Sequence, residues 1–274
     1  MLSTFSLPEL RCILPRVTLS VVLITQNEEQ NLPRTLESAL PLVSDGKGEM
    51  IVVDSGSTDR TVEIAQSFGA KVFVEAWKGF AAQKNSAMDK SSMDWVLQLD
   101  ADESLGPGLA AEIEVALKAD SSLKAFWIPR RNYFLGRWIK HGGFYPDPKL
   151  RLVRRSAGRF EEYGAHPTIK VNGPTGTLSH ALIHNAYPTL RGYIDHMNSY
   201  SSMGAEVAAA KGYREFSVTN TVVRPLLTFI YNYFFRLGFL DGREGLLLHL
   251  YHSAYVSWKY AKAWELSRPN ASKD

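Results

Sequence analysis

Cysteine is nearly absent from this sequence, since Cys12 is the only one among 274 residues. A single cysteine excludes an internal disulfide framework and is typical of proteins in a reducing compartment, which predicts a cytoplasmic location. No apolar run approaches the roughly 20 residues that cross a bilayer. The N-terminal stretch "MLSTFSLPELRCILPR" also lacks the basic start and long apolar run of a secretory signal peptide. We therefore expect neither export nor a membrane-spanning helix.

Several binding signatures are missing as well. No G-x-G-x-x-G motif follows the first predicted strand, and no P-loop occurs anywhere in the sequence. These absences exclude a dinucleotide-binding Rossmann unit, although a nucleotide can still bind through acidic side chains and a metal ion. No helix-turn-helix, RNA-recognition or zinc signature is present, so nucleic acid is not an expected partner.

What the sequence does contain is an alternation of apolar runs, typical of strands, with stretches of helical spacing. Hydrophobic residues make up 45% and charged residues 22%, which is the composition of a globular protein. Strands are predicted at 19–25, 49–53, 71–76 and 94–100, and helices at 28–40, from about 58, and at 79–91. This order predicts an α/β fold with a mostly parallel central sheet flanked by helices. In such a fold, ligands bind at the carboxyl ends of the strands.

Acidic side chains follow three of these strands, in "TQNEE", "DSGSTD" and "DADE". Asp100 and Asp102 are two residues apart, so a continuing strand sends both carboxylates to one face. They are either solvated turn residues or the ligands of a hard cation such as Mg²⁺ or Mn²⁺. Asp54, at the end of the second strand, can accept hydrogen bonds from a base or a ribose. For Asp59, capping the helix that follows is about as good an explanation as a role in binding.

The segment 130–159 is strongly basic, with nine lysines and arginines and one acid, Asp147. A segment of this charge is expected to meet an anionic group, such as a donor diphosphate or an acidic acceptor. In "KLRLVRR", strand alternation predicts one packed face, with Leu150 and Leu152, and one charged face, with Arg151.

From about Leu190 the sequence is predicted to be helical, and the stretch 224–266 is rich in aromatic and basic residues. Because its uncharged runs are too short to cross a bilayer, this composition suits helices that lie in a membrane interface. A helical cap on the sheet, with a surface for a homodimer, is the equal alternative. The tail 268–274 is expected to be disordered.

The motifs "SVVLITQNEE", "IVVDSGSTDRT", "WKGFAAQKNSAM" and "VLQLDADE", in this order and spacing, resemble those of family 2 glycosyltransferases with a GT-A fold. Two further stretches, "GGFYPDPKLRLVRR" and "GFLDGREGLLLHLYHSAYVSWKYAKAWEL", resemble the bacterial lipopolysaccharide inner-core β-glucosyltransferase subgroup. The resemblance covers 18–267. It implies a GT-A domain at 18–190, with a nucleotide-binding half at 18–103 and an acceptor half at 104–190. A C-terminal helical region at 191–267 would follow.

The resemblance also assigns roles to individual residues. Asp102 would ligate Mg²⁺ or Mn²⁺ directly, and Asp100 would contact the ribose or a metal-bound water. The other nucleotide-sugar-binding residues that it implies are Thr25, Asn27, Glu28, Asp54, Lys84 and Asn85. Outside these motifs, His180 and His184 could add a metal ligand, but core packing is the role we expect for both.

The family is inverting, so a base must take the proton of the acceptor hydroxyl as it attacks from the face opposite the phosphate. In the subgroup a His-Glu pair commonly follows the basic strand, whereas here His166 is followed by Pro167. The favoured base is His166, because its ordinary pKa of about 6.5 suits proton abstraction near neutral pH. The carboxylates of Glu161, Glu162 and Asp147 are the nearby alternatives.

Together these features predict a metal-dependent inverting glycosyltransferase. It would move a hexose, with glucose implied by the subgroup, from a nucleotide sugar to a lipid-linked or lipopolysaccharide-core acceptor. A UDP-sugar is the expected donor, and the expected location is peripheral, on the anionic inner face of the cytoplasmic membrane. Because the glutamate expected after His166 is missing, the alternative is a catalytically weak nucleotide-sugar-binding or membrane-associated partner protein.

Overall fold

The computed structural model describes residues 18–119, 122–161 and 167–268. Its centre is a seven-stranded sheet with the order β12-β6-β9-β4-β1-β2-β3. The strands are β1 (Leu19–Thr25), β2 (Gly48–Asp54), β3 (Lys71–Val74), β4 (Trp95–Asp100), β6 (Ala125–Ile128), β9 (Lys149–Arg154) and β12 (Thr175–Thr177). The neighbours β4, β1, β2 and β3 are parallel, while β9 runs antiparallel between β4 and β6. The predicted α/β fold is confirmed.

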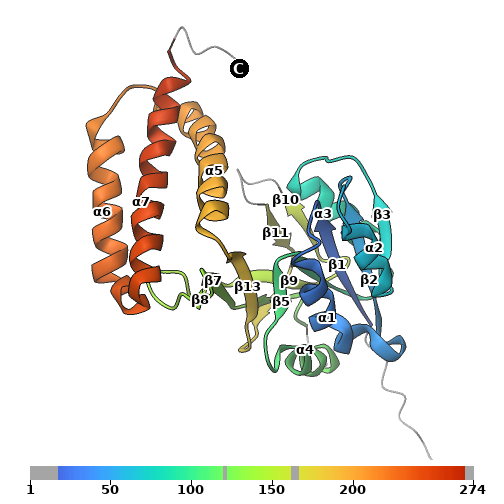
Figure 1. Ribbon diagram of the computed structural model, residues 1–274. Coiled ribbons are helices and arrows are strands. Elements are labelled where there is room, and N and C mark those ends of the chain that lie inside the picture. Colours follow the sequence, from blue (N-terminus) through green and yellow to red (C-terminus); the bar gives the residue numbers. More distant parts are fainter. Residues whose placement is uncertain (1–17, 120–121, 162–166, 269–274) are drawn as a thin grey trace, which may run out of the picture.

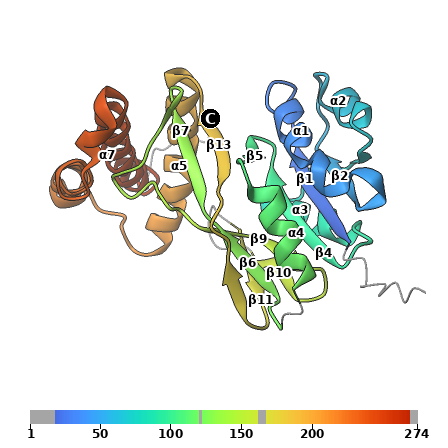
Figure 2. The same cartoon turned by 90° about the horizontal axis from the view of Figure 1, so that it is seen from below.

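Helices cover both faces of this sheet (Figures 1 and 2). The helices around the sheet are α1 (Leu32–Val43), α2 (Thr61–Ser67), α3 (Phe80–Asp89) and α4 (Leu109–Lys118), and a short 3₁₀ turn, Ser44–Gly46, follows α1. Alternate residues of β1 enter separate cores: Val21 and Leu23 pack with α1 and α4, whereas Val22 packs with α3. A strand buried on both faces needs an unbroken apolar sequence, and "LSVVLIT" provides one.

Two of the predicted helices begin later than expected, because the loops after β1 and β2 are ordered turns. Asn27 lies in the left-handed region with φ of 56°, and the backbone amide of Leu32 donates to the Glu28 carbonyl oxygen. The helix predicted from residue 28 therefore starts at Leu32, and the one predicted from about 58 starts at Thr61. These turns form the rim at the carboxyl ends of the strands.

A second sheet of four strands, in the order β5-β13-β7-β8, stands beside the first. Its strands are β5 (Glu103–Leu105), β7 (Arg130–Phe134), β8 (Arg137–Trp138) and β13 (Leu182–Tyr187), and a separate hairpin joins β10 (Gly158–Glu161) to β11 (Thr168–Val171). Because β5 follows β4 after a turn of only two residues, the second sheet begins directly at the end of the first.

The C-terminal part is helical from Leu190, as predicted. Its elements are α5 (Leu190–Ala210), a π-helical turn (Thr219–Val223), α6 (Arg224–Ile230), a second π-helical turn (Tyr231–Phe235), a 3₁₀ turn (Gly238–Asp241) and α7 (Gly242–Glu265). In Figure 1, α7 lies between α6 and α5, and it contacts both. Within the described ranges, no helix has the length and apolar character needed to cross a membrane.

The helical part is fastened to the second sheet at the loop that follows β8. The Asp241 carboxylate accepts hydrogen bonds from the backbone amides of Lys140 and His141. Gly142 comes next, with φ of 65°, and a Cβ atom there would lie 2.0 Å from Cε1 of His249 on α7. Only glycine tolerates both the backbone conformation and the close approach. Two stretches far apart in the sequence, "GGFYPD" and "GFLDG", therefore form one junction.

Candidate active site

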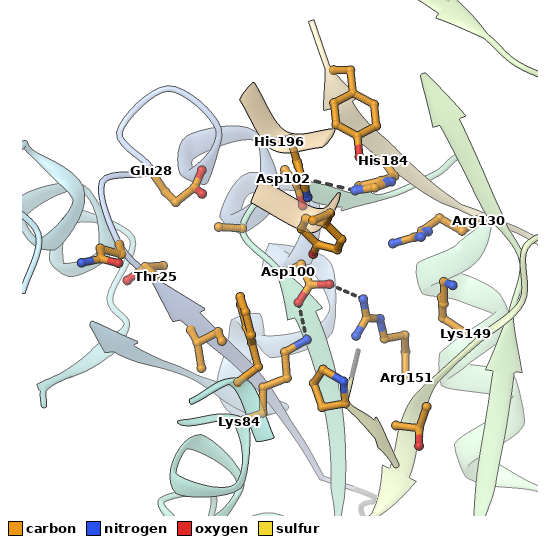
Figure 3. Close-up of a pocket in the computed structure, with 18 of the residues that line it drawn as sticks. Thr25, Glu28, Lys84, Asp100, Asp102, Arg130, Lys149, Arg151, His184 and His196 are labelled. Carbon is orange, nitrogen blue, oxygen red and sulfur yellow. Dashed lines mark hydrogen bonds and ion pairs between the residues drawn. The ribbon is translucent and has the colours of Figure 1, made fainter. Parts of the chain in front are cut away.

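A cavity of about 750 Å³ opens at the carboxyl ends of β1 and β4. Its lining includes residues of both larger sheets, α3 and α5 (Figure 3). The central sheet and α3 supply Ile24, Thr25, Gln26, Glu28, Lys84, Asp100, Ala101, Asp102, Lys149 and Arg151; the second sheet supplies Arg130, His184 and Tyr187; α5 supplies His196 and Tyr200. A cavity of this size accommodates a ligand as large as a nucleotide.

Asp100 lies on the floor of the cavity between two cationic side chains (Figure 3). Its Oδ1 accepts from Lys84 Nζ at 2.6 Å, and its Oδ2 accepts from the Arg151 guanidinium. Burial favours the neutral acid, but the charges of Arg151 and Lys84 outweigh it and hold the pKa of Asp100 well below its ordinary value. Asp100 is therefore a fixed carboxylate.

Glu103 is a site residue that the sequence reasoning missed, although it belongs to the same "DADE" motif. Its side chain is fully buried and accepts from Arg130 and from Arg151, each at 2.8 Å, and from the backbone amide of Asp100 at 3.1 Å. One buried carboxylate thus ties two arginines of the basic segment to the end of β4.

Arginines of the basic segment are paired with carboxylates, which the sequence did not predict. Arg151 is buried, because its strand lies between β4 and β6 and both faces of the sheet are covered. Arg130 is paired with Glu103 and Asp147, and the more exposed Arg159 pairs with Asp89. The face of "KLRLVRR" that was predicted to be charged does carry Arg151, but Asp100 and Glu103 neutralise this arginine.

Asp102 faces His184, with 3.2 Å between Oδ2 of the aspartate and Nε2 of the histidine (Figure 3). Asn132 fixes the histidine tautomer. Its Nδ2 donates to the carbonyl oxygen of Phe144 and to Asp147, so its Oδ1 must accept the Nδ1 proton of His184 at 2.7 Å.

Because Nδ1 carries a proton, Nε2 of His184 meets the Asp102 carboxylate either with a second proton or with a bare electron pair. In the second case, two electron pairs face each other and a cation belongs between them. In the first case, burial works to raise the pKa of Asp102, but the hydrogen bond that Nε2 of His184 donates outweighs it and the pKa is lowered. An ionised carboxylate beside an imidazole nitrogen is a donor pair that suits Mn²⁺.

The expectation that His180 and His184 pack in a core was wrong. His180 has a half-exposed side chain and pairs with Glu112 on α4. His184 lies at the cavity because β13 pairs antiparallel with β5, which places it opposite Glu103 and close to the end of β4. Within the described ranges, no group of three or more histidine, cysteine or acidic side chains is arranged to hold a metal ion.

The residues predicted to bind the nucleotide sugar fall into two groups. Thr25, Glu28, Lys84, Asp100 and Asp102 line the cavity. Burial raises the pKa of Glu28, while the pKa of Lys84 is lowered, again first by burial. Both shifts arise first from burial, which is common where a binding site removes side chains from water.

Asn27, Asp54 and Asn85 form the second group, and they support the rim instead of lining the cavity. The Asp54 carboxylate is fully buried and accepts from Thr25 Oγ1 and from the amides of Gly56 and Ser57. In this arrangement Asp54 holds the turn after β2 and presents no free oxygen to a base.

Asn27 and Asn85 also make structural hydrogen bonds. Asn27 Oδ1 accepts from the amide of Thr58, which joins the two loops at the rim. The Asn85 side chain pairs with the backbone of Phe160 on β10, in both directions at 2.9 Å.

Among the candidate bases, Asp147 and Glu161 are described, whereas His166 and Glu162 lie outside the described residues. Glu161 is exposed, pairs with Lys170 and does not line the cavity. Asp147 accepts from Arg130, Asn132 and Lys149 and lines a smaller adjoining cavity of about 240 Å³. Although its burial favours the neutral acid, the neighbouring Arg130 charge lowers the pKa of Asp147. A carboxylate held by three donors at a low pKa is a weak proton acceptor.

The helical part also contributes to the site, which the sequence reasoning did not foresee. His196 and Tyr200 are one helical turn apart on α5 and both line the cavity, where their rings lie 4.1 Å apart. Their i, i+4 spacing in "DHMNSY" was a readable signal of a shared face. Burial raises the pKa of Tyr200.

The fold is of the GT-A type. The mannosyltransferase PcManGT from Pyrobaculum calidifontis, in complex with GDP-Man and Mn²⁺, has a similar structure, with a TM-score of 0.53. The sequences are 17% identical, and the match covers 89% of this chain and 86% of that one. At this identity the likeness establishes the fold alone.

The chain belongs to glycosyl transferase family 2, whose model matches residues 20–178. It is 28% identical over 269 residues to the lipopolysaccharide core biosynthesis glycosyltransferase LpsC of Rhizobium meliloti (strain 1021), covering 94% of this chain and 97% of that protein. An uncharacterized glycosyltransferase of Rickettsia typhi is also 28% identical, over 91% of this chain and 87% of its own length. The family resemblance predicted from the strand-end motifs is confirmed.

Proposed function

We propose that this chain is a metal-dependent, inverting transferase that moves a hexose, glucose in the first instance, from a UDP-sugar to a lipid-linked or lipopolysaccharide-core acceptor. The observation that carries the proposal is the Asp102–His184 pair just after the carboxyl end of β4. Asn132 holds the imidazole through Nδ1, and Nε2 faces the carboxylate. The similarity to LpsC, which is described as acting in lipopolysaccharide core biosynthesis, supports this class of acceptor.

Asp102 and His184 would hold Mg²⁺ or Mn²⁺, and the diphosphate of the donor would supply further oxygen ligands. The ion offsets the charge of the diphosphate and so makes it a better leaving group. The complex of the mannosyltransferase PcManGT with GDP-Man and Mn²⁺ is in keeping with this assignment. Because Asp100 is already paired with Lys84 and Arg151, it would meet the ribose or a metal-bound water and not the ion itself.

The base is assigned to the segment that precedes β11. Pro167 and Thr168 line the cavity, and His166 directly precedes Pro167 in the sequence. His166 would take the acceptor proton, with Glu162 as the alternative. Asp147 is the least favoured of these three candidate bases, because Arg130 and Lys149 hold it as an ionised hydrogen-bond acceptor.

The test is a donor screen with the purified full chain. UDP- and GDP-sugars are supplied with Mn²⁺, Mg²⁺ or EDTA, and donor hydrolysis and transfer to lipopolysaccharide-core acceptors are measured. We expect turnover from a UDP-hexose that EDTA abolishes, inversion at the anomeric carbon by NMR, and a loss of about 100-fold or more in His166→Ala. Donor binding without turnover, under every condition, would favour the nucleotide-sugar-binding alternative.

The proposal includes a peripheral location on the inner face of the cytoplasmic membrane, where a lipid-linked acceptor is within reach of a cytoplasmic sugar nucleotide. Cell fractionation tests it: we expect the chain in the membrane pellet, released by high salt or carbonate. Recovery only in the soluble fraction would contradict this location and leave the donor chemistry unaffected.

A further inference from the structure

An exposed apolar face covers the helical segment around α6 and the turn that leads into α7. Eleven hydrophobic side chains on this segment are 42–75% exposed. They are Val218, Val222, Val223, Leu226, Leu227, Tyr231, Phe234, Phe235, Leu237, Phe239 and Leu240, and we call them the α6 face. Proteins rarely leave so many neighbouring apolar side chains in water unless the surface meets a partner or a membrane.

The charges on this segment have one sign. From Phe216 to Leu240 the sequence contains no acidic residue, and its two charged residues are Arg224 and Arg236. Of the acids next to this segment, Glu215 directly precedes Phe216, and Asp241 is buried and engaged with the backbone of the loop after β8. Arg243, just beyond the turn, has a side chain that is 89% exposed and pairs with Glu244. The α6 face itself therefore carries two arginines and no carboxylate.

This charge pattern distinguishes between two occupants. In a symmetric dimer through the α6 face, the arginines of both copies would surround one interface, and the face supplies no carboxylate to pair with them. A bilayer with anionic head groups accounts for both the apolar side chains and the arginines, because its acyl region takes the apolar side chains and its phosphates pair with the arginines. The aromatic side chains Tyr231, Phe234, Phe235 and Phe239 suit the boundary between these two regions.

We infer that the α6 face docks on an anionic bilayer, with α6 lying in the plane of the membrane and Arg236 at the level of the head groups. The α6 helix is outermost in Figure 1, with α7 between it and α5. Since α5 lines the cavity through His196 and Tyr200, the docking surface and the cavity lie on opposite sides of α7. Docking therefore leaves the cavity accessible, and the inference does not depend on the proposed transferase reaction.

The experiment is co-sedimentation of the full chain with vesicles of phosphatidylcholine alone or with phosphatidylglycerol. We expect binding to the anionic vesicles that weakens as salt is raised. The double variant Leu227→Glu/Phe235→Glu should lose about tenfold or more of its partitioning, because each carboxylate enters the apolar region. The control is Val115→Glu on α4, which adds one negative charge, half the change of the double variant, at a side chain that is 70% exposed and should bind like the wild type.

A second measurement uses the single cysteine of the sequence. In a Cys12→Ser background, an environment-sensitive fluorophore is attached at Phe235→Cys or, as a control, at Val115→Cys. Anionic vesicles should shift the emission of the label at position 235 to the blue and leave the label at position 115 unchanged. Thermal unfolding confirms that the variants are folded, and donor hydrolysis without vesicles should be the same in the wild type and the Glu variants.

Three results would overturn the inference. The first is a wild-type chain that stays in the supernatant with anionic vesicles. The second is a double Glu variant that binds them as well as the wild type does. The third is a wild-type dimer in sedimentation velocity that the double variant converts to a monomer, since the α6 face would then belong to a second copy. None of these results bears on donor hydrolysis, so the failure of this inference is separable from the failure of the proposed transferase reaction, and only the proposed membrane location is affected by both.

Discussion

Replacing Arg151 by methionine is expected to destabilise the protein more than any surface charge change. Methionine fills a similar volume but removes the donors to Gln98, Asp100 and Glu103. Hydrogen bonds to charged groups contribute about 1.5–3 kcal/mol each, and removing one partner of a buried ion pair costs about 3–5 kcal/mol. In the variant, Asp100 keeps its ion pair with Lys84 and Glu103 keeps its ion pair with Arg130. We therefore expect a loss of unfolding free energy at the lower end of this range, about 3 kcal/mol at neutral pH.

The assay is urea unfolding followed by circular dichroism, with thermal melts in parallel. For a domain of this size a loss of about 3 kcal/mol lowers Tm by roughly 6–12 °C. The matched control is Arg159→Met, because Arg159 pairs with Asp89 and both side chains are more than half exposed. An exposed pair of this kind contributes at most about 1 kcal/mol.

The effect of Arg151→Met should also depend on pH. In the wild type the pKa of Asp100 is lowered, so its ion pairs stabilise the fold fully above the unfolded value of about 3.9. This stabilisation is lost as pH falls below that value toward the folded pKa. Arg151→Met lacks part of this stabilisation already. The difference in unfolding free energy between the wild type and the variant should therefore become smaller in acid. A loss below about 1 kcal/mol at neutral pH, or a difference independent of pH, would refute this account of the buried network.

Three further predictions concern other parts of the chain. Asp102→Asn and His184→Ala should each weaken Mn²⁺ binding in the presence of UDP by about 10-fold or more, measured by calorimetry, and unchanged affinity would remove both from the metal site. Hydrogen bonds from Lys71 and Ser92 outweigh burial and lower the pKa of Glu49 from 4.5 to about 2. The stabilisation that ionised Glu49 contributes should therefore be present above about pH 4.5 and lost toward pH 2. Glu49→Gln should make the unfolding free energy less dependent on pH over this range. Asp241→Asn should speed amide hydrogen exchange in the loop around His141, because that loop depends on its carboxylate; exchange at the wild-type rate would contradict this.

Much of the fold was readable from local pattern. Apolar runs such as "LSVVLIT" predicted buried strands, and the acids that follow them predicted a polar rim at the carboxyl ends. Asp100 and Asp102 were identified this way, Thr25 and Glu28 were implied by the family resemblance, and all four line one cavity. Their positions follow from the parallel order of β4, β1 and β2, which short-range alternation of strands and helices largely dictates.

The partners of these acids were not readable, because each comes from a distant strand or helix. His184 reaches Asp102 only through the pairing of β13 with β5, and Tyr200 reaches the cavity only because α5 turns back toward the sheet. The burial of Arg151 was missed for the same reason. A charged residue in a strand predicts an exposed face unless an acid elsewhere in the chain compensates it, and Glu103 and Asp100 do so here.

The motifs of the sequence identified the family. The sequence by itself also determined the class of fold and the edge of the sheet at which the cavity lies. These depend on hydrophobic periodicity and on turns, which act over a few residues. The tertiary structure decided which carboxylates are fixed by arginines, which one faces an imidazole and which, such as Asp54, only hold a turn. Charge state and accessibility depend on what lies within a few ångströms in space, and only the folded chain brings those groups together.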